Sequence, residues 1–349
     1  MQTIRRVKAE KVFKFSVSVF KHVGVGEEEA KIIAENLTLA NLRGIDSHGV
    51  VRLPVYIRRV IKGLIDPLGP IETVKDQGSI AIIDAHNNFG QVAAMQAVLL
   101  AAKKARDYGA VTVGVRNSNH FGIAAHYAMK LTEQKLIGII LSNAPPAIAP
   151  WGGKIPMFGT NPVCVGFPVD KNESIILDMA LSVVARGKIR LADLKGEKIP
   201  DGWAFDENGN PTNDPKAALM GSLAPVGGPK GYGLALAVDL FCGLLIGSSY
   251  GRDVKELNDF SGPSGTGFFI EAINIEHFRP YQEYKNLITD YIMNIKRCPR
   301  RNGVKEIFLP GEMELRETEV RRRLGIPLDE QTFLLLKNLA VELGISCPF

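Results

Sequence analysis

The segment Asp46–Pro54 (DSHGVVRLP) holds side chains suited to chemistry on a hydroxy acid. His48 and Arg52 are four residues apart, so on an α-helix they would share one face. An arginine can hold a carboxylate through two parallel hydrogen bonds, and an imidazole can exchange a proton with a neighbouring hydroxyl or carbonyl. Ser47 would either orient His48 or cap the helix. The alternative is a capped surface helix with an incidental histidine and arginine.

A second polar cluster, Arg116–Gly122, stands between an expected strand and an expected helix. Backbone N–H groups at the start of that helix could bind a phosphate. From its position alone, His120 fits three roles equally well: catalysis, contact with a cofactor, or an ordinary loop position. His126 follows six positions later and does not share a helical face with His120, which argues against a metal pair.

Other segments carry weaker signals. Glycines and prolines between residues 149 and 162 would bring the backbone and Thr160 close to a ligand, or would form only a rigid loop. Lys230 precedes an expected helix within a glycine-rich run, which suits either a phosphate or a flexible lead-in. The remaining candidates are a strand end followed by a lysine and one plain turn, namely Asp178, Met179, Ala180 and Lys188, and then Pro310, Gly311 and Glu312.

No dinucleotide fingerprint follows the first strand of the expected α/β region. The nearest approach to GxGxxG is GPSGTG at Gly262–Gly267, and it precedes a strand rather than a helix. The run Gly227–Gly233 also lacks the spacing of a P-loop. A Rossmann-type fold is therefore not supported.

Composition places the chain among ordinary globular proteins. Its 349 residues predict about two domains, and 46% are hydrophobic and 23% charged. The net charge of +5 is spread along the chain, and the densest basic run, Arg321–Arg323, fits a surface helix better than a nucleic-acid site. The four cysteines form no CxxC pair, so neither a zinc site nor a disulfide framework is expected. We expect catalysis without a metal.

Nothing in the chain predicts insertion into a membrane. The first fifteen residues contain no apolar signal core, and the longest apolar run, Gly231–Gly247, is short and carries Asp239. We interpret that run as a buried helix, and we expect a cytoplasmic protein.

Hydrophobic periodicity predicts an α/β protein with helices at both ends of the chain. A helix is expected over Glu27–Leu42 and another from about Ser47, and helical patterning returns from about Tyr281. We expect one discontinuous helical domain, 1–70 with 281–349, and an α/β domain over 71–280. The elements expected inside the second domain are strands at 79–84, 111–115, 137–142, 175–177 and 267–275, helices at 90–106, 122–136 and 231–245, and loops at 143–168 and 201–214.

Six segments in this order resemble one family. They are IDSHGVVRLP, RNSNHFGIA, APWGGKIPMFGTNP, LDMALSVVARGKI, PDGWAFDENGNPTNDPKAAL with GGPKGYGLALAVD, and FLPGE. The ordered set is similar to the malate/L-lactate dehydrogenase family, which also contains sulfolactate and ureidoglycolate dehydrogenases and cyclic imine reductases. The resemblance runs from about residue 10 to residue 330.

The resemblance implies NAD or NADP as cofactor, a mixed-sheet cofactor domain of non-Rossmann type, and a homodimer with active sites near its interface. It implies that Ser47 and His48 transfer the proton, that Arg52 binds the carboxylate, and that Thr160 contacts the substrate. His120, Phe121 and Gly122 match a cofactor-binding turn, although some members give this histidine the catalytic role. The remaining matches to cofactor contacts are Asp178, Met179, Ala180, Lys230, Pro310, Gly311 and Glu312, and Lys188 belongs to the same set of candidates.

The reaction that we expect is hydride transfer between NAD(P) and C2 of a small 2-hydroxy or 2-oxo acid. Malate and oxaloacetate come first, then sulfolactate or L-lactate, and then a cyclic imino acid. Imine-reducing members can carry an acidic residue where Lys188 stands, and this departure favours hydroxy acids. The alternative of another class is a protein that binds nucleotides without catalysis.

Overall fold

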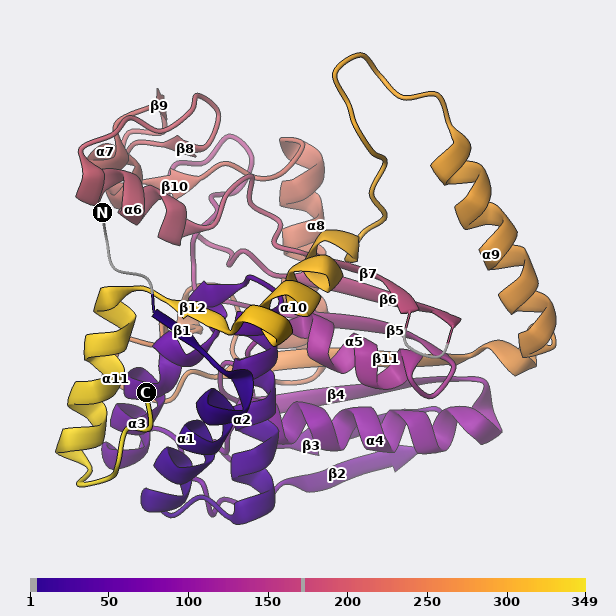
Figure 1. Cartoon of the computed structure of the whole chain (residues 1–349), viewed down its shortest axis with the longest axis horizontal. Helices are drawn as coiled ribbons and strands as arrows, with labels where there is room; N and C mark the ends of the chain where they lie inside the picture. The colour runs from indigo at the N-terminus through magenta and orange to yellow at the C-terminus, as the bar shows by residue number, and fades with distance from the viewer. Residues whose placement is uncertain (1–4, 171–172) are drawn as a thin grey trace.

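A computed structural model describes residues 5–170 and 173–349, and its centre is a mixed seven-stranded sheet (Figure 1). The strand order is β2-β3-β4-β11-β5-β6-β7, in which β3 and β4 are parallel and every other neighbouring pair is antiparallel. This topology confirms a mixed sheet that is not of Rossmann type. The strands are β2 (Glu72–Gln77), β3 (Ile80–Asp84), β4 (Ala110–Ser118), β5 (Leu136–Ser142), β6 (Val163–Asp170), β7 (Glu173–Met179) and β11 (Thr266–Asn274).

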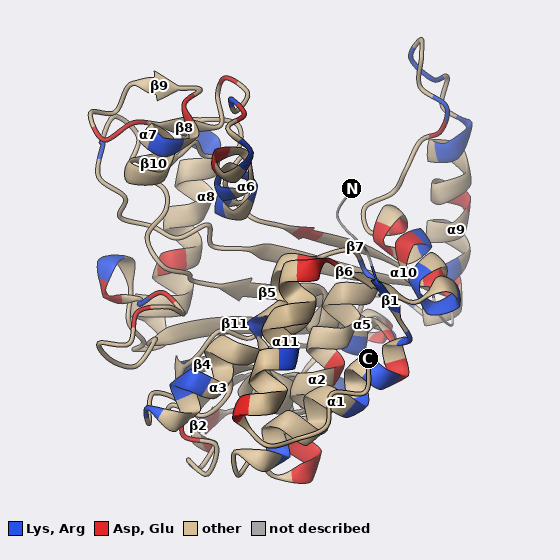
Figure 2. Ribbon diagram, turned by 60° about the vertical axis from the view of Figure 1, so that its left-hand side comes forward, with Lys and Arg blue, Asp and Glu red and all other residues tan. Residues whose placement is uncertain are grey.

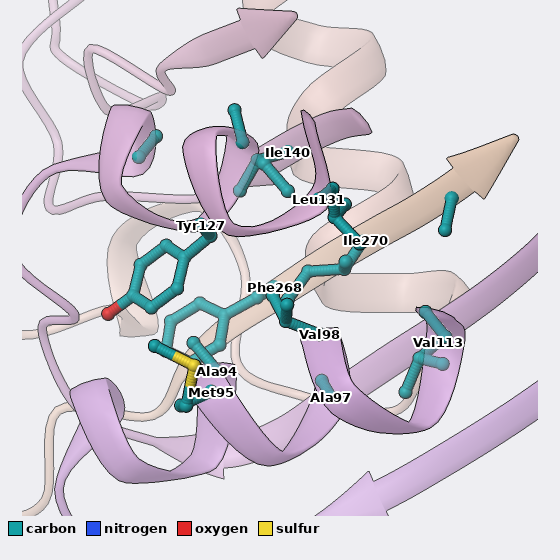
Figure 3. Packing of buried hydrophobic residues seen from close by; sticks show 14 of the residues in the cluster. Ala94, Met95, Ala97, Val98, Val113, Tyr127, Leu131, Ile140, Phe268 and Ile270 are labelled. Carbon is teal, nitrogen blue, oxygen red and sulfur yellow. The ribbon is translucent and has the colours of Figure 1, made fainter. Parts of the chain in front are cut away.

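Two helices, α4 (Gly90–Tyr108) and α5 (Ala124–Thr132), pack on this sheet and bury its main core. The helix α4 presents a run of small residues to the strands, among them Ala94, Ala97 and Ala101, all fully buried. Small side chains let a helix approach a sheet closely, and the aromatic rings of Tyr127 and Phe268 fill the space beside them (Figure 3). The core therefore fixes the segment between β4 and α5, which carries His120.

The two chain ends share a second core. Residues near the N-terminus, such as Val12 and Ile33, pack in one cluster with Leu336 and Leu339. The short strands β1 and β12 pair antiparallel and join the ends in the same place. The elements are β1 (Arg5–Val7), α1 (Ala9–His22), α2 (Glu27–Leu42), α3 (Leu53–Ile61), α10 (Glu312–Leu324), β12 (Ile326–Leu328) and α11 (Glu330–Glu342). A helical domain of residues 1–70 and 281–349 stays a prediction, and α9 (Tyr281–Arg297), which falls in that range, has no buried residue and stands outside this core (Figure 2).

A small lobe with a third core lies inside the stretch expected as one α/β domain. It contains α6 (Arg186–Lys195), β8 (Ala204–Phe205), β9 (Pro211–Thr212), α7 (Pro215–Met220) and β10 (Ser222–Leu223). The helix α8 (Pro229–Asp239) follows and continues as a π-helical turn, Leu240–Leu245. The prediction of a buried helix here is wrong for one side of it, because Leu234, Leu244 and Leu245 are more than half exposed.

Several predicted boundaries also differ from the structure. The expected helix at 122–136 is shorter because Gly122 and Lys135 have positive φ angles, +80° and +63°, which an α-helix excludes. The predicted loop at 143–168 ends early, because β6 begins at Val163, and the loop at 201–214 contains β8 and β9. The strand expected at 175–177 is longer in the structure, where β7 covers Glu173–Met179. In the described residues, no helix is long and apolar enough to cross a membrane.

Candidate active site

The segment with Ser47, His48 and Arg52 is not a regular helix, so the predicted sharing of one helical face is wrong. Two 3-10 turns, Asp46–His48 and Val50–Arg52, are separated by Gly49, whose backbone is extended at ψ −151°. The α-helix α3 begins only at Leu53, with proline in its first turn. A Cβ on Gly49 would lie 2.2 Å from the Asn41 side chain, so the sharp turn needs glycine.

Local hydrogen bonds nevertheless bring the three side chains together. Ser47 Oγ lies 3.0 Å from His48 Nδ1, and Arg52 Nε donates to the Ser47 carbonyl at 2.7 Å. Ser47 makes no helix-capping bond, which favours the prediction that it orients His48. Burial, and then the charge of Arg52, lower the pKa of His48 to about 4. His48 is therefore neutral and able to accept a proton near neutral pH.

The same loop is anchored from the far end of the chain. Arg321 of α10 donates to the Asp46 carboxylate at 2.7 Å and to the Asn41 carbonyl at 2.6 Å. The Asn41 amide in turn donates to Asp46 at 2.6 Å, and its oxygen accepts from Val50 N at 2.9 Å. The Arg321 side chain is almost buried, whereas the Asp46 carboxylate is about half exposed.

His120 comes from a different layer of the molecule and stacks on His48. The two ring centroids are 5.4 Å apart and the rings are inclined by 28°. The Tyr56 hydroxyl lies 2.6 Å from His120 Nδ1, and Gly122 N donates to the same atom at 3.3 Å. Burial, and then the charges of His48 and Arg52, hold the pKa of His120 well below its usual range. The ring is therefore neutral.

The turn that carries His120 is held by the core. The Phe121 ring stacks on Phe268 with centroids 4.6 Å apart, and its carbonyl accepts from the Tyr127 hydroxyl at 2.5 Å. The Phe121 side chain thus belongs to the core. Close approach also fixes this turn, because a Cβ on Gly90 would lie 2.1 Å from the Asn119 carbonyl oxygen.

Two expected cofactor segments, far apart in the sequence, meet beside α5. Ile176 N donates to the Pro310 carbonyl at 3.1 Å, and a Cβ on Gly311 would lie 2.9 Å from the Ile176 carbonyl oxygen. Asp178, two residues further along β7, accepts from Ala125 N in the first turn of α5 at 2.9 Å. Burial raises the pKa of the Asp178 carboxyl. The glycine at 311 thus lets the turn lie directly against β7.

Arg43 lies in this neighbourhood and was not predicted from the sequence. It is 5% exposed, its Nε has no hydrogen-bond partner among the described residues, and its Nη1 lies 3.7 Å from Met129 Sδ. Burial lowers the pKa of Arg43, and the charges of Glu314 and Asp178 partly oppose that effect. A buried guanidinium with an unpaired N–H suits an anionic ligand, so Arg43 fits a phosphate of a dinucleotide.

The other candidates have a less direct relation to this site. Glu312 is engaged by Lys296, by Arg316 at 2.8 Å and by Leu309 N at 2.9 Å, so it stabilises the turn that it ends. The Thr160 carbonyl accepts from Leu181 N at 2.7 Å. Met179 is half-buried and Ala180 exposed at the end of β7, and Lys188 and Lys230 are exposed on α6 and α8. In the part of the chain that the structure describes, no hydrogen bond joins Thr160, Lys188 or Lys230 to either histidine. No group of three possible metal ligands occurs in that part either.

Sequence reasoning also missed Tyr56, Gln91 and Arg190. Tyr56 and Gln91 are fully buried, and Gln91 Nε2 donates to the Tyr56 hydroxyl at 3.0 Å. Arg190 of α6 lies near enough for its charge to add to the effect of burial in lowering the pKa of Arg52. Tyr56 lies four residues after Arg52, which was the one local signal that could have revealed it.

Comparison with known proteins identifies the class of enzyme. Residues 7–337 match the model of the malate/L-lactate dehydrogenase family. A malate dehydrogenase of Pyrococcus abyssi is 39% identical over 98% of this chain and 96% of that protein. The structure of a sulfolactate dehydrogenase from Methanocaldococcus jannaschii superposes with a TM-score of 0.93 at 40% identity, covering 98% of both chains. The structure of a malate dehydrogenase from Entamoeba histolytica superposes with a TM-score of 0.94 at 31% identity, covering 99% of this chain and 100% of that one.

The chain belongs to the malate/L-lactate dehydrogenase family and is a 2-hydroxy-acid dehydrogenase. Membership of this family implies a nicotinamide cofactor.

Proposed function

We propose that this enzyme interconverts malate and oxaloacetate with NAD or NADP. The observation that carries the proposal is the stacking of His48 on His120 beside Arg52, which gives one site two neutral imidazoles and a cation. A 2-oxo acid offers one carboxylate and one adjacent oxygen, and this set of side chains is suited to both.

Each side chain then has a distinct duty. Arg52 uses Nε on the Ser47 carbonyl, which leaves its two Nη groups for the C1 carboxylate. His48 exchanges the proton of the C2 oxygen, and Ser47 orients its ring through Nδ1. His120, stacked on His48, lies next to the same C2 oxygen. Thr160 contacts the substrate. The nicotinamide, when bound, supplies or accepts the hydride at C2.

The residues that would hold the cofactor lie along the end of β7 and the start of α10. We assign Asp178, Met179, Ala180, Pro310 and Gly311 to it, with Arg43 near its phosphates and Glu312 stabilising the turn. The other contributors are the His120–Gly122 backbone, including Phe121, and Lys188 and Lys230 from the small lobe and α8.

Two neighbouring cations support an acid with two anionic groups as the substrate. Arg190 lies near Arg52, and like charges are unfavourable together unless a ligand neutralises them. An acid with a second anionic group satisfies both arginines, whereas lactate satisfies one. Malate is therefore preferred over lactate, and sulfolactate is the second candidate because a sulfonate needs the same contacts.

A panel of acids tests this assignment. We expect oxidation of NAD(P)H with oxaloacetate or sulfopyruvate, and much weaker oxidation with pyruvate or a cyclic imino acid. Arg190→Ala should lower kcat/KM for the dianionic acid by about tenfold, the effect of one charged hydrogen bond, and should leave pyruvate unchanged. The exposed Lys195→Ala on the same helix is the matched control. Equal kcat/KM for pyruvate and oxaloacetate would refute a role for Arg190 in specificity.

We also propose a homodimer. Large apolar side chains remain exposed on α8 and the turn after it, where Phe241, Leu244 and Leu245 are 42%, 54% and 62% exposed. Exposed apolar patches of this kind mark association surfaces. Light scattering at the mass of one chain, 38.1 kDa, across the micromolar range would contradict the dimer.

A further inference from the structure

Gln91 is buried in the first turn of α4, and a chain of hydrogen bonds connects it to the active site. Its side chain is 0% exposed, and its Nε2 donates to the Tyr56 hydroxyl at 3.0 Å. Tyr56, itself 1% exposed, lies 2.6 Å from His120 Nδ1. The three side chains come from α4, α3 and the turn after β4, so each element holds one link.

One backbone N–H group fixes the direction of each hydrogen bond from Gln91 through Tyr56 to His120. Gly122 N can only donate, and it points at His120 Nδ1 from 3.3 Å. Nδ1 must then be unprotonated, so the Tyr56 hydroxyl gives its one proton to Nδ1 and can only accept from Gln91. The Gln91 amide must therefore turn its NH2 group to Tyr56, and a neutral His120 carries its proton on Nε2.

The Oε1 atom of Gln91 indicates that the amide is not there only to stabilise the fold. Its Oε1 is buried and has no hydrogen-bond partner among the described residues. An unpartnered buried carbonyl is unfavourable, and an apolar side chain of similar length, such as methionine, would avoid that cost. The contribution of Gln91 lies in the donor that it offers to Tyr56.

We infer that Gln91 is a positioning residue, which acts through Tyr56 to hold His120 as the Nε2–H tautomer and to present that N–H to the substrate's C2 oxygen. Only the hydrogen bond from His120 to the substrate rests on the proposed function. The inference gives the stacked histidines different duties, because His120 donates a fixed hydrogen bond and His48 exchanges the proton.

Two variants test the inference in the full-length enzyme. Gln91→Met removes the hydrogen-bond donor with little change in side-chain volume. Gln91→Glu reverses the direction of the hydrogen bond to Tyr56, because a carboxylate accepts the hydroxyl proton. His120 Nδ1 then no longer receives a hydrogen bond from Tyr56. Nitrogen-15 NMR of labelled histidine, with the His120 signals identified by their loss in His120→Asn, reports the tautomer without any turnover. We expect Nε2–H in the native enzyme and a shift towards Nδ1–H in Gln91→Glu. Gln91→Met should lower kcat by about tenfold and leave cofactor binding unchanged.

The matched control is Gln96→Met, the same change at an exposed position of α4. A native His120 with its proton on Nδ1, or a tautomer and kcat that neither Gln91 variant alters, would overturn the inference. If the native enzyme reduces no 2-oxo acid while the tautomer still follows residue 91, the proposed function and the substrate role of His120 fail, and the control of the tautomer stands.

Discussion

The two stacked histidines are held by different physical means. His120 lies on a turn fixed by buried groups: Phe121 stacks on Phe268, and Ile123 N donates to the Asn36 side chain at 3.2 Å. His48 lies on a partly exposed loop whose main anchor is an ion pair to Arg321, from a helix near the other end of the chain. A buried turn keeps one geometry, whereas an anchored loop can adjust when a ligand binds.

This difference suits the proposed division of labour. A fixed hydrogen-bond donor gains from rigidity because its position need not change during the reaction. A group that exchanges protons gains from contact with water and from a pKa that the bound ligand can shift. The comparison therefore predicts that changes in the loop alter catalysis with little loss of stability, and that changes around the turn alter both.

The largest expected effect is on the histidine of the loop. His48→Ala should lower kcat by at least about 10²-fold, the lower end for a general acid–base residue. The dissociation constant of NAD(P)H, measured by fluorescence, should hardly change. If His120→Ala abolishes turnover and His48→Ala does not, the two histidines exchange roles.

Substitution of Arg52 should have the second largest effect on catalysis. Arg52→Leu removes two charge-assisted bonds to the carboxylate and should lower kcat/KM for the acid by about 10²-fold, or about 3 kcal/mol of transition-state binding. Arg52→Lys keeps the charge without the planar fork and should lose less. Steady-state kinetics with a cofactor titration measures both. A weaker cofactor with an unchanged KM for the acid would move Arg52 to the nucleotide phosphates.

The anchor of the loop should have a smaller effect. Arg321→Met removes the ion pair to Asp46 and should lower kcat by about tenfold, because His48 is then less well positioned. The His120 tautomer should not change, which separates the two regions. Arg322→Met, at the next and exposed position, is the control. Unaltered kcat in Arg321→Met would show that the loop holds its shape without α10.

The effect furthest from catalysis concerns the acid stability of the buried region. His126 on α5 is fully buried without a partner for either ring nitrogen among the described residues, and burial lowers its pKa from 6.5 to about 4. The unfolded state binds this proton more readily, so stability falls as pH decreases from about 6.5 to about 4. His126→Leu should remove up to about 3 kcal/mol of that loss, seen in denaturant unfolding at several pH values. The exposed His22→Leu is the control, and an equal pH slope in His126→Leu and the native enzyme would contradict this account.

The local elements and the residue types of the site could be predicted from the amino-acid sequence alone. Periodicity predicted Glu27–Leu42 as a helix to the residue, and the missing glycine fingerprint correctly excluded a Rossmann fold. The cluster at Ser47, His48 and Arg52 was also visible, since its members lie within one short segment. Its helical geometry was wrong, because the turn at Gly49 depends on contact with Asn41, which periodicity does not record.

The meeting of residues that are distant in the sequence depends on how the elements pack in three dimensions. Arg321 reaches Asp46 across 275 positions of the chain, and Tyr56 reaches His120 across 64. In the sequence, Tyr56 is one large residue among the apolar positions of α3, and Arg321 is one of three arginines in a row. A contact between separate elements leaves no local period in either segment. Packing around a shared core therefore selected, from many similar side chains, the few that position the two histidines.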